Sequence, residues 1–243
     1  MPLPKIDTPV YELTLPLSKK KIKYRPFLVK EQKNLLMAME SGDKDSIEKN
    51  VIQVLNNCTI TEGIDIEKLP VLDIEMYFIH LRARSVGEIV ENKYRCENEV
   101  DGKPCGNVME NSVNLLDLQI SDVPKNDGVI QLTPNISIKL GYPKFSVLNK
   151  ISEVTSATEV AFKMIADSVE YIYDDSVQQF YYAREVSQDE IVEFIESLSQ
   201  QQYEKIEEFF SKLPKLEKKI EMKCSRCGFE HNLDIEGLES FFA

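Results

Sequence analysis

Two pairs of cysteines, far apart in the chain, constrain what this sequence can fold into more than any other feature. Cys96 and Cys105 have eight residues between them, whereas Cys224 and Cys227 form a C-x-x-C motif. More than a hundred residues separate the two pairs. Four thiolates are a ligand set that suits a tetrahedral, structural Zn²⁺. A single shared ion would therefore bring two remote parts of the chain together.

Each cysteine pair lies between segments in which apolar and polar residues alternate, a pattern that predicts β-strands. A glycine directly follows the second cysteine of each pair, at Gly106 and Gly228, and allows the backbone to turn back tightly. The sequence therefore predicts a zinc ribbon assembled from two distant hairpins, at about residues 88–113 and 218–235.

Other readings of the cysteines stay open at this point. A C-x-x-C motif can serve redox chemistry or form a disulfide, although a redox motif usually opens a helix. The pairs could also be a degenerate site that has lost its metal. His231 could replace one thiolate as a ligand, although its place in a strand pattern favours a structural role. Cys58 is isolated after a predicted helix and is expected to be a small buried residue.

The start and the charge of the chain bear on its compartment and partners. The first residues contain no charged segment followed by an apolar run, and no stretch approaches about 18 consecutive apolar residues, so we expect no signal peptide and no membrane span. A reducing cytoplasm is then expected, which favours a metal site over disulfides. The chain has 243 residues and a net charge of −12. That charge repels phosphate and argues against a broad nucleic-acid surface.

No catalytic set is recognisable in the sequence. His80 lies in an apolar helical pattern and is expected to be packed. The acidic pairs Asp174–Asp175 and Glu207–Glu208 are expected to face solvent. The glycine-rich and nucleophile motifs of common enzyme families are absent. Because a zinc ion with four thiolate ligands keeps no open position for water, the sequence predicts a protein that is not an enzyme.

The remaining patterns predict an α+β fold with a mainly helical body and β-hairpins. Alternation at about 10–27 and 129–140 predicts two further hairpins. Helical patterns cover about 31–39, 47–55, 70–84 and most of 145–213. Capping boxes are expected at Asp45 with Glu48, Ser187 with Glu190, and Ser199 with Gln202.

The chain is expected to divide into four segments. These are an N-terminal hairpin with helices (1–87), the first zinc-ribbon hairpin (88–115), a hairpin with a helical region (116–217), and the second zinc-ribbon hairpin with a C-terminal tail (218–243). A last helical turn in the tail would place Leu238 on one face with Phe241 or Phe242. The tail is expected either to fold back onto the chain's own core or to dock on another protein or a second copy.

Several segments are distinctive in combination. They are Tyr11–Pro16, Ile22–Lys33, Leu81–Glu88, Cys224–Phe229 and Gly237–Phe242. Together they resemble the baseplate hub and hub-assembly proteins of T-even-type contractile-tailed bacteriophages, and the resemblance covers nearly the whole chain. It implies a hub component or an assembly chaperone that contacts other baseplate hub or tail proteins. It also implies a place in the infected host cytoplasm during assembly, or in the tail baseplate of the virion.

A different class of function is a cytoplasmic zinc-ribbon adaptor that binds nucleic acid or a polymerase. The net charge and the lack of a basic, aromatic face around the ribbon disfavour it. An enzyme with an unrecognised site is a third reading. An assay of DNA and RNA binding would separate the adaptor from the phage assembly protein.

Overall fold

The structure is a computed structural model that describes residues 6–121, 127–145 and 156–236. The described chain forms two compact units. Among the described residues, the first unit contains 6–64, 75–121 and 215–236. The second unit contains 65–74, 127–145 and 156–214. No helix in these ranges has the length and apolar run needed to cross a membrane. The tail residues Leu238, Phe241 and Phe242 lie outside the described residues.

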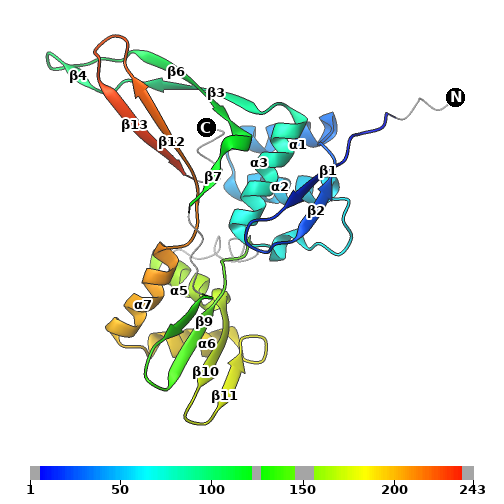
Figure 1. Cartoon of the computed structure of the whole chain (residues 1–243), viewed down its shortest axis with the longest axis vertical. Helices are drawn as coiled ribbons and strands as arrows, with labels where there is room; N and C mark the ends of the chain where they lie inside the picture. The colour runs from blue at the N-terminus through cyan, green and yellow to red at the C-terminus, as the bar shows by residue number, and fades with distance from the viewer. Residues whose placement is uncertain (1–5, 122–126, 146–155, 237–243) are drawn as a thin grey trace. The chain divides into compact units, whose positions relative to one another are not determined.

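Helices and small antiparallel sheets are mixed in the described chain, which confirms the α+β fold. Strands occupy nearly as much of it as helices, so the body is mixed rather than mainly helical. The first unit opens with the expected hairpin (Figure 1). Its elements before the two cysteine-bearing hairpins are β1 (Tyr11–Thr14), β2 (Lys21–Tyr24), α1 (Val29–Ser41), α2 (Lys44–Cys58) and α3 (Val71–Ser85), the last of which begins in the second unit.

The hairpin is attached to the helices through buried tyrosines. The ring of Tyr24, at the end of β2, meets the ring of Tyr77 from α3 edge-on, with 5.3 Å between centroids. The hydroxyl groups of Tyr77 and Thr59 lie 2.9 Å apart, which satisfies a phenol that is otherwise removed from water. Alternation in the hairpin therefore reflects one face packed on the helices and one face in solvent.

A buried carboxylate joins three elements of the first unit. Glu31 is 2% exposed and accepts a hydrogen bond from the Arg25 guanidinium at 3.1 Å. Its other oxygen accepts the backbone N–H of Leu28 at 2.7 Å, which caps the start of α1. Arg25 also donates to the carbonyl of Asn57 in α2. Burial alone would raise the pKa of Glu31, but the hydrogen bonds from Arg25 and Leu28 outweigh it and lower the pKa.

The two predicted cysteine-bearing hairpins are present in the first unit. The elements are β3 (Ile89–Arg95), β4 (Glu99–Val100), β5 (Lys103–Pro104), β6 (Val108–Asn114), a 3₁₀ turn η2 (Leu115–Asp117), β7 (Gln119–Ile120), β12 (Leu216–Lys223) and β13 (Glu230–Glu236). β3 pairs with β6, and β12 pairs with both β13 and β7. The β3–β6 and β12–β13 hairpins lie side by side in Figure 1, with their cysteine-bearing ends together.

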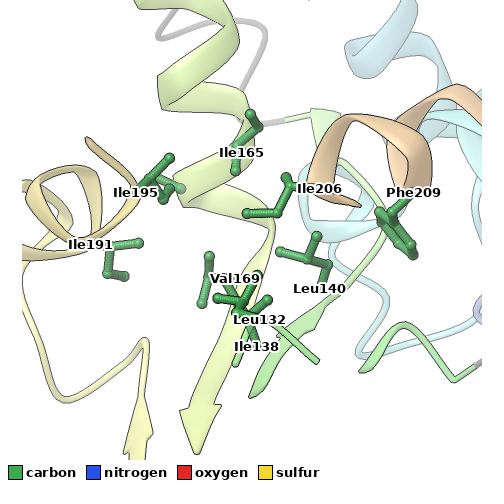
Figure 2. Packing of buried hydrophobic residues seen from close by; sticks show 10 residues of the cluster. Leu132, Ile138, Leu140, Ile165, Val169, Ile191, Ile195, Ile206 and Phe209 are labelled. Atoms are coloured by element: carbon green, nitrogen blue, oxygen red, sulfur yellow. The ribbon is translucent and has the colours of Figure 1, made fainter. Parts of the chain in front are cut away.

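The second unit is a four-stranded antiparallel sheet packed against helices. Its strand order is β11-β10-β9-β8. The elements are the 3₁₀ turn η1 (Ile66–Lys68), β8 (Val129–Gln131), β9 (Ile136–Leu140), α5 (Ala157–Ser168), β10 (Val169–Asp174), β11 (Gln179–Tyr182), α6 (Gln188–Glu196) and α7 (Gln200–Ser211). Figure 2 shows its core, where Ile138 and Leu140 from the sheet meet Ile165, Ile195 and Ile206 from the helices.

One expectation about local structure was incomplete and another was wrong. The described residues within 145–213 are mainly helical, in α5, α6 and α7, but they also contain the hairpin β10–β11, which the sequence did not predict. The start of α2 is capped by Asp43, whose carboxylate accepts the N–H of Ser46, so Asp45 lies inside the helix. The capping boxes that begin at Ser187 and Ser199 are confirmed.

We predict that Glu31→Ala lowers the free energy of unfolding by roughly 3–5 kcal/mol, because it removes the carboxylate partner of the Arg25 guanidinium and the acceptor of the helix-capping N–H of Leu28. Glu88→Ala removes an exposed ion pair with Arg84 and should cost less than about 1 kcal/mol. Urea unfolding at pH 7 measures both. Equal losses would contradict the structural role of Glu31.

The same pair of variants tests the pKa of Glu31. Because the folded state lowers this pKa below its ordinary value of 4.5, the carboxylate stabilises the fold above that pH, and the contribution is lost as the pH falls through the lower, folded pKa. Wild-type stability should therefore fall more steeply on acidification than that of Glu31→Ala. Parallel pH profiles would show that Glu31 has the same pKa in both states.

We also predict that Gly128→Ala is more damaging than Gly63→Ala. Both glycines have a left-handed backbone, with φ of 78° and 77°. A Cβ at Gly63 would meet no atom within 4 Å, whereas a Cβ at Gly128 would collide with the carbonyl oxygen of Leu140. Gly63→Ala should cost about 1–2 kcal/mol of unfolding free energy, and Gly128→Ala roughly 1–3 kcal/mol more. Denaturant unfolding of each variant checks the order, which equal losses would refute.

Candidate metal centre

Four cysteine thiols lie close together at the ends of the two cysteine-bearing hairpins. The sulfur atoms of Cys96, Cys105, Cys224 and Cys227 all lie within 4.8 Å of one another. Sγ of Cys96 is 3.6 Å from Sγ of Cys227, and Sγ of Cys105 is 3.8 Å from Sγ of Cys224. Zinc–sulfur bonds of about 2.3 Å in a tetrahedron place the sulfurs about 3.8 Å apart. A disulfide needs about 2.05 Å, and all four cysteines are free thiols.

The eight residues between the first two cysteines form a small hairpin of their own. β4 and β5 pair across a turn at Asp101–Gly102, where both residues have positive φ. Below this turn the strand ladder continues past the cysteines. The N–H of Cys96 donates to the carbonyl of Asn107 at 2.8 Å, and the N–H of Cys105 donates to the carbonyl of Asn98 at 2.7 Å. The long spacing therefore loops out of the site without separating the two thiols.

The second pair sits in a tight turn between β12 and β13. The N–H of Cys224 donates to the carbonyl of Phe229, and the N–H of Gly228 donates back to the carbonyl of Cys224 at 2.9 Å. Gly228 has φ of 76°, and Gly106 after the first pair has φ of 65°. Both glycines thus have a left-handed backbone, which permits the tight turn that the sequence pattern predicted.

Two asparagines that sequence analysis did not single out direct their amides at the cluster. The side-chain amide of Asn98 lies 3.7 Å from the sulfur of Cys227, and that of Asn107 lies 3.5 Å from the sulfur of Cys224. The backbone N–H of each asparagine also faces the cysteine two residues before it. Each therefore offers donors to both cysteine pairs, which would offset the negative charge of bound thiolates. The sequence feature that could have pointed to these two asparagines is the C-x-N pattern, which occurs at both cysteines of the first pair.

The thiols have unequal environments. The backbone N–H groups of Cys227 and Arg226 point at the sulfur of Cys224 and lower its pKa to about 6. Burial has the opposite effect on Cys96 and raises its pKa to about 12. One member of the cluster is therefore ready to ionise near neutral pH. A divalent cation bound first at this thiolate would favour ionisation of the others.

The other cysteine and the two histidines lie in different settings. Nε2 of His231 is 3.2 Å from Sγ of Cys96, so this side chain touches the edge of a cluster that already offers four sulfurs. Cys58 is fully buried beside Arg25, and burial raises its pKa to about 11. His80 is half-buried in α3, and burial lowers its pKa. Cys58 is not one of the clustered thiols.

The acidic pairs are engaged locally. Asp174 accepts hydrogen bonds from Ser176, and Asp175 accepts one from the hydroxyl of Tyr173, so this pair organises the turn after β10. Glu208 forms an exposed ion pair with Lys212, the residue that follows the end of α7. These contacts match the solvent-facing role that the sequence predicted for both pairs.

Comparison with known proteins identifies relatives for almost the whole chain. A family model described as T4 bacteriophage base plate protein matches residues 8–243. The baseplate hub assembly protein gp26 of Enterobacteria phage T4 is 26% identical over 233 residues, which span 96% of this chain and 97% of that protein. No solved structure matches the chain. The matched region contains both cysteine-bearing hairpins.

We predict that the chain purified without chelator carries one metal ion held by the four clustered thiols. Cys224→Ser should lose the ion and melt at least about 5 °C lower, because losing a cross-link between remote hairpins should cost at least roughly 2 kcal/mol. Elemental analysis and thermal melting measure both effects. Cys58→Ala, which changes a buried thiol outside the cluster, should keep the ion. A metal-free wild type, or loss of metal from Cys58→Ala alone, would refute the assignment.

Proposed function

The chain belongs to the T4 bacteriophage base plate protein family, and from this premise we propose that it helps to build the central hub of the tail baseplate. The observation that carries the proposal is the length of the match, which runs over residues 8–243. The related T4 protein bears the name of a hub assembly protein and aligns over 96% of this chain. The chain would act as a hub component or as an assembly chaperone, by binding other hub or tail proteins.

The role requires a folded surface rather than chemistry on a substrate. A four-thiolate ion has its coordination positions filled, so it would hold the two hairpins together and would offer no site for activating water. The sulfur–sulfur distances of 3.6 and 3.8 Å and the amide donors around them support Zn²⁺ as that ion. The proposed protein is therefore a zinc-stabilised binding protein without turnover.

Charge favours a protein partner over a nucleic acid. The two cysteine-bearing hairpins, residues 88–114 and 216–236, contain seven lysines and arginines against eleven aspartates and glutamates. Two of the lysines are paired with glutamates across the strands, Lys93 with Glu110 and Lys223 with Glu230. The ribbon thus lacks the continuous basic strip that tracks a phosphate backbone. Assembly would take place in the infected host cytoplasm, with the virion baseplate as the final location of a hub component.

The test is to inactivate the gene in its phage and supply the chain from a plasmid. We predict that the mutant phage makes few infectious particles and lacks complete baseplates in electron micrographs, and that the wild-type chain restores both. Cys58→Ala should restore them as well, whereas Cys224→Ser should restore them poorly at high growth temperature, because its hairpins are no longer joined by the ion.

Mass spectrometry of purified virions then separates the two forms of the proposal. A hub component is present in a fixed number of copies per particle, and an assembly chaperone is absent from particles although it is needed to make them. Normal baseplates and normal titres without the gene product would reject both forms.

A further inference from the structure

The sheet of the second unit has one face packed on helices and one face that carries aromatic rings. Ile130, Ile138 and Ile172 lie in one row across β8, β9 and β10. Ile138 belongs to the core cluster that Figure 2 shows, and Ile130 and Ile172 pack against that cluster. Because side chains alternate between the two faces of a strand, the neighbours of these residues point away from the core. On β10 and on the edge strand β11 beside it, the residues that point away from the core are aromatic.

Four rings on this outward side touch one another. The opposed pairs are Tyr173 with Phe180 and Tyr171 with Tyr182. Their ring centroids lie 4.4 Å and 6.1 Å apart, and contacts of 5.2 Å and 5.8 Å connect the two pairs through Phe180. We call these four residues the aromatic face. Cross-strand aromatic pairs stabilise the hairpin, but the stability of a hairpin does not require them to stay uncovered.

A β-bulge places the aromatic face outward. Val169 pairs with Leu140 and packs in the core, and the register shifts by one residue before Tyr171, which pairs with Lys139. In a regular ladder Glu170 would pair with Lys139, and the alternation would turn Tyr171 toward the core; the bulge takes up Glu170 as an extra residue and keeps Tyr171 pointing outward. Bulges of this kind re-aim side chains, and this one completes a contiguous group of rings on the outer side of the sheet.

The exposure of the aromatic face marks it as a binding surface. Phe180 is 45% exposed and Tyr182 is 36% exposed, on β11 at the edge of the sheet. Contiguous apolar surface of this kind is rare on monomeric proteins outside interaction sites, and tyrosine and phenylalanine are enriched at protein interfaces. Rigid rings also give large contact area at low entropic cost.

Contacts within the chain indicate what the aromatic face would bind. The guanidinium of Arg184 lies over the ring of Tyr182, 4.8 Å from its centroid, so the rings accept a cation on their faces. Asp175 accepts a hydrogen bond from the hydroxyl of Tyr173, and Glu185 pairs with Arg184, so both carboxylates lie beside the rings. Over the whole hairpin, residues 169–185 contain four carboxylates, those of Glu170, Asp174, Asp175 and Glu185, and one cation, Arg184. This excess of carboxylates complements a positively charged partner surface.

We propose that the aromatic face docks an arginine-bearing surface of another baseplate protein. The proposal names the contact surface for the hub-building role and rests on that role. Partner guanidinium groups would stack on the rings and pair with the surrounding carboxylates, an arrangement that arginine suits better than lysine because its head group is planar and weakly hydrated. Single-stranded nucleic acid also stacks on aromatic sheets, but its phosphates would meet the carboxylates at the rim.

The experiment measures binding of the full chain to the other hub proteins of its phage, each expressed alone, by biolayer interferometry. Phe180→Ser with Tyr182→Ser removes two rings from the aromatic face and should weaken the tightest interaction at least tenfold. Tyr181→Ser is the matched control, because Tyr181 is 40% exposed on the same strand but points to the other face. It should change the affinity less than twofold. Phe180→Leu keeps an apolar side chain without the ring and should weaken binding measurably.

Circular dichroism melts of each variant exclude unfolding as the cause, and Phe180→Ser alone replaces the double variant if the latter melts early. A photo-crosslinking residue at the exposed Val177 should capture a partner segment that contains an arginine, and changing that arginine to alanine should reproduce the loss. Unchanged binding of the double variant to a hub protein would overturn this inference and leave the hub role intact. Binding to no hub protein would overturn both.

Two further outcomes would reassign the surface. Equal weakening by Tyr181→Ser would show that the edge of β11, rather than the aromatic face, makes the contact. Tighter binding of labelled single-stranded DNA or RNA than of any hub protein, lost in the double variant, would assign the face to nucleic acid.

Discussion

Sulfur atoms from residues 119 positions apart in the chain lie 3.8 Å from each other, and the arrangement of the two hairpins depends on that contact. The hairpins are also joined at their other end. β7, which follows the first hairpin, pairs with the start of β12, and the N–H of Ser121 donates to the carbonyl of Lys215. The contact between the sulfurs and the pairing of β7 with β12 each involve only a few residues. Together they hold two long, solvent-exposed hairpins at both ends, where each hairpin by itself would be marginally stable.

The elements that could be predicted from sequence are those with one face packed on the protein core and the other exposed to solvent. Residues 10–27 and 129–140 alternate because of that difference, and both hairpins are present. The hairpin of β10 and β11 was missed for the opposite reason. In Tyr171–Tyr173 and Phe180–Tyr182 both faces are apolar or aromatic, so the period of two disappears from the sequence. The aromatic residues that remove the alternating pattern from these two strands include the four that form the aromatic face.

The cysteine cluster shows a similar division between what local sequence encodes and what it does not. Cysteine pairs with a following glycine could be recognised because few other residue types carry that chemistry. The eight residues between Cys96 and Cys105 make a longer spacing than the C-x-x-C of the second pair, and the hairpin of β4 and β5 accounts for it. The repeated C-x-N sequence marks Asn98 and Asn107, but it does not show which sulfur their side-chain amides face, because those sulfurs belong to the other hairpin. Such donors depend on tertiary structure.

The order of synthesis gives the thiol cluster a consequence in time. A ribosome adds about 5–20 residues per second, so a gap of 119 positions between Cys105 and Cys224 corresponds to roughly 6–24 s of translation. The intervening chain contains most of the second unit, whose core residues are all synthesised before Cys224. The first pair of thiols is therefore present in the growing chain for that interval without its partner pair. An ion that needs all four thiols would bind only to chains that have been translated past Cys227. Bound metal would therefore mark such chains and would be absent from chains that stop earlier.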